Sequence, residues 1–265
     1  MPAAAFEDPS LPKFRAVEAP RTGCGRFRPE RMCRSPARST ASVGCVEIEE
    51  LTPNLSVLRD GAWQCYLWRE GGRSMLVDTG APGLGDRIRD AVGSVDTVVL
   101  THFHADHTGS AAHVREWSGA TVVAGAGDAA IIRGEVAGPP PVLEDWERPL
   151  FERVTTGLPW TVPPVRVDRE VSDGDELDNG AQVLALPGHT EGSIALYLPQ
   201  HRVLFTGDTA AHFEGRVMLG TFNLDRERTA AGLRKLAALD VEVACFGHGE
   251  PIVEAAGERL RAAGV

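Results

Sequence analysis

Residues 101–109 read Thr-His-Phe-His-Ala-Asp-His-Thr-Gly and place four metal-binding side chains within six positions, His102, His104, Asp106 and His107. Imidazole nitrogens and carboxylate oxygens are the ligands that zinc and similar divalent metals bind in proteins. Packing alone rarely requires three histidines and a carboxylate on one short loop. A hydrolytic metal centre is therefore the first hypothesis, and a solvated polar turn whose histidines bind nothing is the alternative.

Three later segments each place one more potential ligand at a turn that follows an apolar run. These are His189 after residues 181–187, Asp208 after residues 202–206, and His248 after residues 241–246. Apolar runs bounded by glycine are typical of buried strands, and loops at strand ends are where a rigid scaffold presents functional groups. The seven side chains are enough for two metals, because one tetrahedral catalytic zinc needs only three protein ligands and an open position.

The order and spacing of these residues resemble the metallo-β-lactamase superfamily of hydrolases over about residues 46–262. The 102–107 run matches the family's His-x-His-x-Asp-His signature, and the three later ligands match its later metal motifs. The resemblance implies a first metal held by His102, His104 and His189, a second held by Asp106, His107 and His248, and Asp208 as a bridge between them. It also implies that Asp78 orients these ligands, as carboxylates behind a metal site commonly do.

Strand and helix patterns alternate in two halves of the sequence. The predicted strands are 54–58, 62–68, 73–77, 97–100 and 121–124, followed by 165–168, 181–186, 193–198, 202–206 and 242–246. The predicted helices are 84–92, 109–118, one from about Gly127, 226–239 and 252–262. An α/β (α+β) fold of the family's type accommodates this order, an αββα four-layer sandwich of two sheets between outer helices. The seven ligands would then gather on loops at one edge of the sandwich.

The first 42 residues differ in composition from the rest. They carry eight Lys and Arg against four Asp and Glu, a net charge of +4, whereas residues 43–265 carry 19 against 33, a net charge of −14. Six prolines and no sustained periodicity are typical of a disordered extension. We expect residues 1–42 to be an inert extension, or to precede the natural start, with a regulatory tail as the alternative. Residues 43–265 are the expected catalytic domain.

Several functions are disfavoured by composition. No apolar run approaches the about 20 residues that a membrane-spanning helix needs. The five cysteines, an odd number without a secretory signal, favour reduced thiols in the cytoplasm. The segment 43–265 has a net negative charge and no cluster of Lys and Arg near the metal motifs. Nucleic-acid binding depends on such clusters. The expected partner is therefore a small molecule, with neither nucleic acid nor membrane.

Substrate choice is expected to lie in an insertion at about 134–164. It combines Gly138-Pro-Pro-Pro141 with the aromatic residues Trp146, Phe151 and Trp160, and a long segment between core strands often forms a lid. Apolar walls suit a small organic substrate, so Trp146 and Trp160 are candidate substrate contacts. A helical flap that simply covers the sandwich is the alternative. His212, four positions after Asp208, is a further candidate contact.

The resemblance implies hydrolysis of an ester, thioester or lactone. Two divalent metals, zinc first and iron or manganese as alternatives, would share a water and lower its pKa toward about 7, so that hydroxide attacks the carbonyl. Asp106 and Asp208 are the residues expected to act at this centre. The bridging Asp208 disfavours antibiotic hydrolysis, since β-lactamases of the superfamily usually lack it.

Other functions remain open at this point. A persulfide dioxygenase of the same scaffold would hold a single iron with His102, His189 and Asp208. A phosphodiesterase or nuclease, or a binding module without catalysis, ranks below both. Thioester-cleaving glyoxalase II relatives share the 205–209 run Phe-Thr-Gly-Asp-Thr, but this chain lacks a clear basic and tyrosine set for glutathione.

Overall fold

The fold is described from a computed structural model, which covers residues 46–61, 63–156 and 162–264. The expectations for residues 1–42 and for Trp160 lie outside these ranges. Within them, no helix is both long and apolar enough to cross a membrane.

The larger sheet holds seven strands of the described chain in sequence order. Its strands are β1 (Glu47–Thr52), β2 (Leu55–Asp60), β3 (Trp63–Glu70), β4 (Arg73–Val77), β5 (Thr97–Leu100), β6 (Thr121–Gly125) and β7 (Arg169–Val171). The first four strands pair antiparallel, and β4 to β7 run parallel. The central parallel strands β5 and β6 are short continuous runs of mostly Val, Leu and Ala because both of their faces are covered.

The smaller sheet has the order β13-β10-β9-β8. Its strands are β8 (Gln182–Ala185), β9 (Ile194–Leu198), β10 (Val203–Phe205) and β13 (Val243–Cys245). Here β10 and β13 pair parallel, and the other pairs are antiparallel. A separate hairpin of β11 (Ala210–Phe213) and β12 (Arg216–Leu219) follows the 3-10 turn η1 (Gly207–Thr209).

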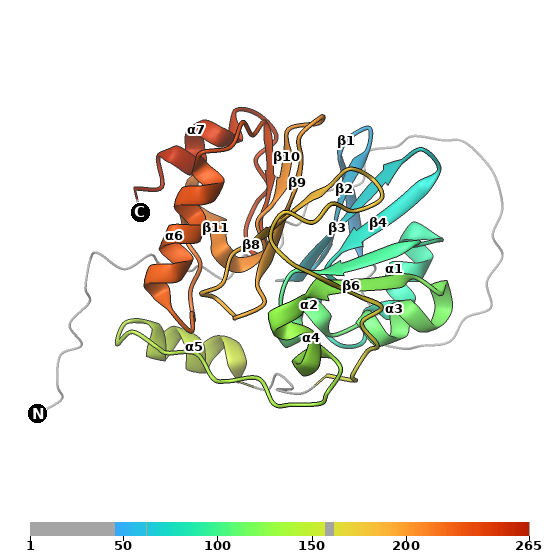
Figure 1. Ribbon diagram of the computed structural model, residues 1–265, viewed down its shortest axis with the longest axis horizontal. Coiled ribbons are helices and arrows are strands. Elements are labelled where there is room, and N and C mark those ends of the chain that lie inside the picture. The colour runs from blue at the N-terminus through green and yellow to red at the C-terminus, as the bar shows by residue number, and fades with distance from the viewer. Residues whose placement is uncertain (1–45, 62, 157–161, 265) are drawn as a thin grey trace, which may run out of the picture. The chain divides into compact units, whose positions relative to one another are not determined.

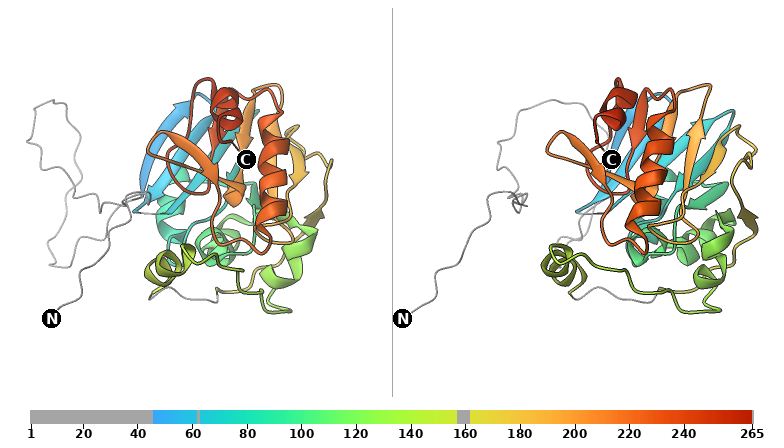
Figure 2. Two further views of the ribbon diagram at one scale, coloured as in Figure 1. Left: turned by 90° about the vertical axis from the view of Figure 1, so that its left-hand side faces the viewer. Right: turned by 60° about the vertical axis from the view of Figure 1, so that its left-hand side comes forward.

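Helices cover the outer faces of both sheets. The described helices are α1 (Gly85–Val92), α2 (Ala105–Thr108), α3 (Ala111–Ser118), α4 (Ala126–Ile132), α5 (Glu147–Thr155), α6 (Arg226–Ala237) and α7 (Ala256–Arg261). Figure 1 shows α1 and α3 beside the larger sheet and α6 and α7 beyond the smaller one. Figure 2 shows α6 and α7 in front of the smaller sheet, with α5 next to the end where α6 begins. The predicted αββα sandwich is confirmed.

Three apolar clusters correspond to these layers. Successive residues of a strand point to opposite faces, so Val98 packs in the cluster under α1 and α3 while Val99 packs between the two sheets. Leu196 and Phe205 of the smaller sheet join Val99 in that middle cluster, and Leu204 packs with α6 in the third. Each such fully buried side chain stabilises the fold by roughly 1.5–3 kcal/mol relative to an exposed one.

Most predicted elements are confirmed, and the differences have local causes. Residues 165–168 are not a strand, and the strand begins at Arg169. The side chain of the preceding residue, Asp168, accepts hydrogen bonds from Val122 N and Arg115. The last helix begins only at Ala256, because Ile252 still exchanges backbone hydrogen bonds with Ala244.

Six of the described elements were not predicted: β1, the short helix α2, α5, the 3-10 turn η1 and the two strands β11 and β12. The β11–β12 turn consists of Glu214 and Gly215 with φ of 51° and 75°. Positive φ at both central residues is the geometry of tight hairpins, but the usual signal is Asn-Gly or Asp-Gly. Because Glu214 stands where Asn or Asp is usual, the sequence did not predict this hairpin.

Candidate metal centre

The predicted ligands meet at one edge of the sandwich because their loops follow strands that end there. Asp78 follows β4 and the 101–109 loop follows β5; Asp208 follows β10 and His248 follows β13. Since β4 and β5 are parallel neighbours, as are β10 and β13, the carboxyl ends within each pair lie together. His189 lies on the loop from β8 to β9. The structure brings all seven predicted side chains together.

Three histidine rings converge on one point. His102 Nε2 lies 3.1 Å from His104 Nδ1, and His189 Nε2 lies 3.3 Å and 3.0 Å from the same two atoms. Burial, before any neighbouring charge, lowers the pKa of all three, that of His104 to about 3. The rings are therefore neutral, which is the form in which imidazole binds a metal.

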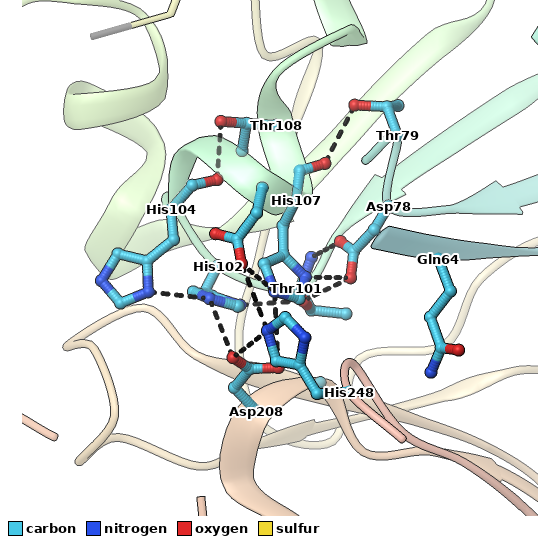
Figure 3. Close-up of polar contacts among 12 residues, drawn as sticks. Gln64, Asp78, Thr79, Thr101, His102, His104, His107, Thr108, Asp208 and His248 are labelled. Carbon is cyan, nitrogen blue, oxygen red and sulfur yellow. Dashed lines mark hydrogen bonds and ion pairs between the residues drawn. The ribbon is translucent and has the colours of Figure 1, made fainter. Parts of the chain in front are cut away.

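A second group consists of Asp106, His107 and His248. His248 Nε2 lies 3.2 Å from Asp106 Oδ2 and 3.3 Å from Asp208 Oδ2. Asp208 Oδ2 also lies 3.9 Å from His102 Nε2 and 3.7 Å from His189 Nε2. Asp208 thus stands between the two groups, as Figure 3 shows.

In the second group the pKa values of the histidines shift in the opposite direction. Burial by itself would lower the pKa of His107 and His248, but neighbouring carboxylates outweigh it and raise both. For His107 these are Asp208 and Asp78, and for His248 they are Asp208 and Asp106, which raise its pKa to about 10. In return, His248 and His107 overcome the effect of burial on Asp208 and hold its pKa well below the usual range. The protons on His107 and His248 lie beside negative carboxylates. A divalent cation can take the place of such protons.

Asp78 fixes the tautomers of two ligands. Its Oδ2 accepts hydrogen bonds from His107 Nδ1 and Thr101 Oγ1, each at 2.8 Å, and its Oδ1 accepts one from Thr101 N at 2.8 Å. Because the Thr101 hydroxyl proton is donated to Asp78, His102 Nδ1 at 3.0 Å must donate to Thr101 Oγ1. Both histidines therefore carry the proton on Nδ1 and direct Nε2 into the site (Figure 3). The predicted orienting role of Asp78 agrees with this geometry.

The residues present fit divalent cations. His107 Nε2 and Asp208 Oδ1 are buried and have no hydrogen-bond partner among the described residues. They lie 3.4 Å apart, and a buried polar atom without a partner is costly unless an ion or water satisfies it. These two atoms, together with the three converging rings, form a donor set of nitrogen and oxygen that suits zinc, iron or manganese.

The candidate substrate contacts are more scattered. His212 Nδ1 donates to Glu250 O at 2.7 Å, and its ring lies against Phe246. Trp146 is 45% exposed at the start of α5, where the Arg226 guanidinium lies 5.7 Å from its ring centroid. In the described part of the chain, neither side chain makes a hydrogen bond, ion pair or ring contact with the seven predicted ligands, and their predicted role stays a prediction.

Sequence reasoning missed three buried polar residues that hold the ligand loops. They are Gln64 on β3, Tyr66 on β3 and Asp128 on α4. Gln64 and Tyr66 read as ordinary members of an alternating strand, and Asp128 reads as an acid in the first turn of a helix. No local signal distinguishes them, because their partners lie far away in the sequence.

Comparison with known proteins decides the family. The model of the Metallo-beta-lactamase superfamily matches residues 59–248. This chain belongs to that superfamily. Together with the three His and Asp groups, membership supports the use of divalent metal by this chain.

The curated relatives include two kinds of hydrolase. The acyl-coenzyme A thioesterase MBLAC2 of Gallus gallus is 36% identical over 162 residues, which are 54% of this chain and 56% of that protein. A hydroxyacylglutathione hydrolase of Rhodobacter capsulatus is 30% identical over 207 residues, 75% of this chain and 66% of that protein. The chain therefore spans about half to two thirds of the length of these relatives.

Solved structures agree on the fold. BJP-1, a subclass B3 metallo-beta-lactamase of Bradyrhizobium japonicum, superposes with a TM-score of 0.59 at 21% identity, covering 83% of this chain and 90% of its own. TTHA1623, solved in a di-iron-bound form, gives a TM-score of 0.56 at 28% identity and covers 78% of this chain and 94% of its own.

Proposed function

We propose that this protein is a dinuclear metal-dependent hydrolase that cleaves the thioester bond of a small organic substrate. The observation that carries the proposal is the pair of ligand groups on either side of Asp208. In one group three neutral rings converge, and in the other two histidines face carboxylates. The relatives named as thioesterase and as hydroxyacylglutathione hydrolase favour thioesters over other esters and lactones.

The assignment of ligands follows the two groups. His102, His104 and His189 would hold the first metal, Asp106, His107 and His248 the second, and Asp208 would bridge them. Zinc is the proposed metal, with iron as the main alternative, since the donor set alone does not distinguish them.

The exposed side of the site indicates where substrate enters. The side chains of His102 and His107 are only 1% exposed, whereas those of Asp106 and His248 retain 24% and 31%. Substrate would therefore approach over Asp106 and His248. Asp106 Oδ2, which lies 3.2 Å from His248 Nε2 on this side, would orient the attacking water.

Bound divalent metals would supply a water of lowered pKa and a Lewis acid for the carbonyl oxygen. No protein nucleophile is required, and the described cysteines are unsuited to that role. Burial raises the pKa of the Cys65 and Cys245 thiols, so both stay protonated in the core.

The 134–164 insertion adjoins the site through its backbone. Val142 N donates to Asn223 O at 2.9 Å, and Leu224 N donates to the carbonyl of the ligand His189 at 3.2 Å. Phe151 of α5 packs edge to face on Phe222. Exposed apolar side chains then follow along the insertion at Val136, Val142, Trp146 and Val154. We propose that they contact the apolar part of the substrate, which is consistent with a lid rather than a plain cover.

The test couples elemental analysis of the purified protein to turnover of acyl thioesters. We expect two metals per chain and hydrolysis, and an Asp208→Ala variant that loses metal and rate together. Asp168→Asn is the matched control, because Asp168 accepts Val122 N and Arg115 Nη2, each at 3.0 Å, outside the site. An Asp208→Ala variant with full metal content and rate would refute the dinuclear mechanism. One iron per chain with oxygen uptake would instead indicate the persulfide dioxygenase.

A further inference from the structure

Asp128 is a buried carboxylate that joins two ligand loops without touching a ligand ring. It lies in the first turn of α4 and its exposed fraction is 0%. One oxygen, Oδ2, accepts Phe103 N at 2.9 Å and Thr190 Oγ1 at 2.7 Å, and Oδ1 accepts Gly192 N at 2.7 Å. Phe103 stands between His102 and His104 in the chain, and Thr190 follows His189.

A buried carboxylate is energetically unfavourable, so packing alone does not explain Asp128. None of the ion pairs among the described residues involves Asp128, and burial raises its pKa. Taking an unpaired charge out of water is unfavourable unless hydrogen bonds compensate it. The compensation here consists of three hydrogen bonds, and all three come from the loops that carry the three-histidine group.

The surrounding backbone is built for this contact. A side chain at Gly192 would overlap the backbone and side chain of Asp128, and one at Gly125 would overlap Gly192 O. A side chain at Gly127 would press on the Glu191 carbonyl. Three glycines therefore let the start of α4 approach the 190–192 loop closely enough for the carboxylate to bridge it.

The His248 loop is held by a different group. Gln64 Nε2 donates to Phe246 O at 2.7 Å and to Gly249 O at 2.8 Å, one on each side of His248 in the chain. Tyr66 OH donates to Phe246 O at 2.9 Å. Figure 3 shows Gln64 on the His248 side of the site, away from His104.

We propose that Asp128 and Gln64 are separate positioning residues, Asp128 for the three-histidine half and Gln64 for the His248 half. Each sets the metal affinity of its own half by fixing the loops that carry the ligands. This inference rests on the proposed two-metal centre and adds that the two affinities are controlled independently.

The experiment follows histidine ring ¹⁵N resonances of the full-length, chelator-stripped protein as free Zn²⁺ is raised in buffered steps. His102, His104 and His189 report the first half, and His107 and His248 report the second. In Asp128→Asn we expect the first half to bind Zn²⁺ about 10- to 100-fold more weakly, the range found for residues that support metal ligands. The second half should stay within about twofold. In Gln64→Met, which keeps the length but removes the donors, the pattern should reverse.

Asp168→Asn serves as control and should leave both affinities within about twofold of wild type. If Asp128→Asn does not fold, Thr190→Val removes one of the same hydrogen bonds and should weaken the first half selectively. Equal weakening of both halves, or unchanged affinities, would overturn the inference. Failure of the wild-type histidines to bind Zn²⁺ would refute the proposed metal centre itself, which separates the two results.

Discussion

Replacing Asp78 by asparagine tests how the site is held together. The oxygens of Asp78 accept three hydrogen bonds, two at Oδ2 and one at Oδ1. An amide keeps one oxygen and places a donor where the other oxygen was. The less costly orientation keeps the oxygen facing His107 Nδ1 and Thr101 Oγ1 and turns the NH₂ group toward Thr101 N.

The magnitude follows from that orientation. One buried donor left without a partner costs about 1–3 kcal/mol, and the loss of negative charge beside His107 adds to it. We expect the free energy of unfolding of the metal-free protein to fall by about 2–4 kcal/mol. For a domain of this size, that is a decrease in Tm of about 4–16 °C. Because the neutral amide also makes His107 a weaker base, Zn²⁺ affinity should fall by about 10- to 100-fold.

Thermal unfolding of metal-free protein and chelator competition measure the two effects. Asp96→Asn is the matched control, since Asp96 is exposed and a single oxygen, Oδ2, accepts both Ser74 N and Ser74 Oγ. Its amide can turn the NH₂ group to solvent, so the expected loss is below about 1 kcal/mol with unchanged Zn²⁺ affinity. An Asp78→Asn variant that matched wild type in Tm and affinity would refute the role assigned to these hydrogen bonds.

Three further predictions concern pH, the core and the insertion. In the metal-free protein His107 and His248 have raised pKa values, about 10 for His248, so each must release a proton to bind metal. Zn²⁺ affinity of that half should therefore rise with pH by about tenfold per unit for each proton released, up to the raised pKa. Chelator competition between pH 6.5 and 9 measures this, and a flat profile would contradict it. Leu196→Ala, in the fully buried middle cluster, should cost about 2–5 kcal/mol of stability in denaturant titrations, and an unaltered metal content would show that the site survives. Trp146→Ser should raise KM for thioesters with long apolar acyl groups while kcat and KM for acetyl thioesters stay unchanged; equal effects on both substrates would argue against an apolar contact.

Much of the candidate site could be predicted because residue types that bind metal are recognisable in the sequence itself. His102 to His107 are dense in sequence, and Asp208 and His248 each follow a short apolar run ending in glycine. Strand β5 was predicted to the residue, since Thr-Val-Val-Leu between polar turns favours a buried strand. The β11–β12 hairpin and the supporting residues Gln64 and Asp128 were missed because nothing local distinguishes them.

The sequence by itself identified the candidate chemistry: which side chains are suited to bind metal, and that most of them follow strands. Side-chain type and spacing suffice for this, because ligand preference is a property of individual groups. Only the tertiary structure decided which ligands stand together, which tautomers they hold and what supports them. Asp128 meets Gly192, and Gln64 meets Phe246, across 64 and 182 positions of the chain. Such contacts depend on how two sheets pack, and packing is a property of the whole core rather than of any local pattern.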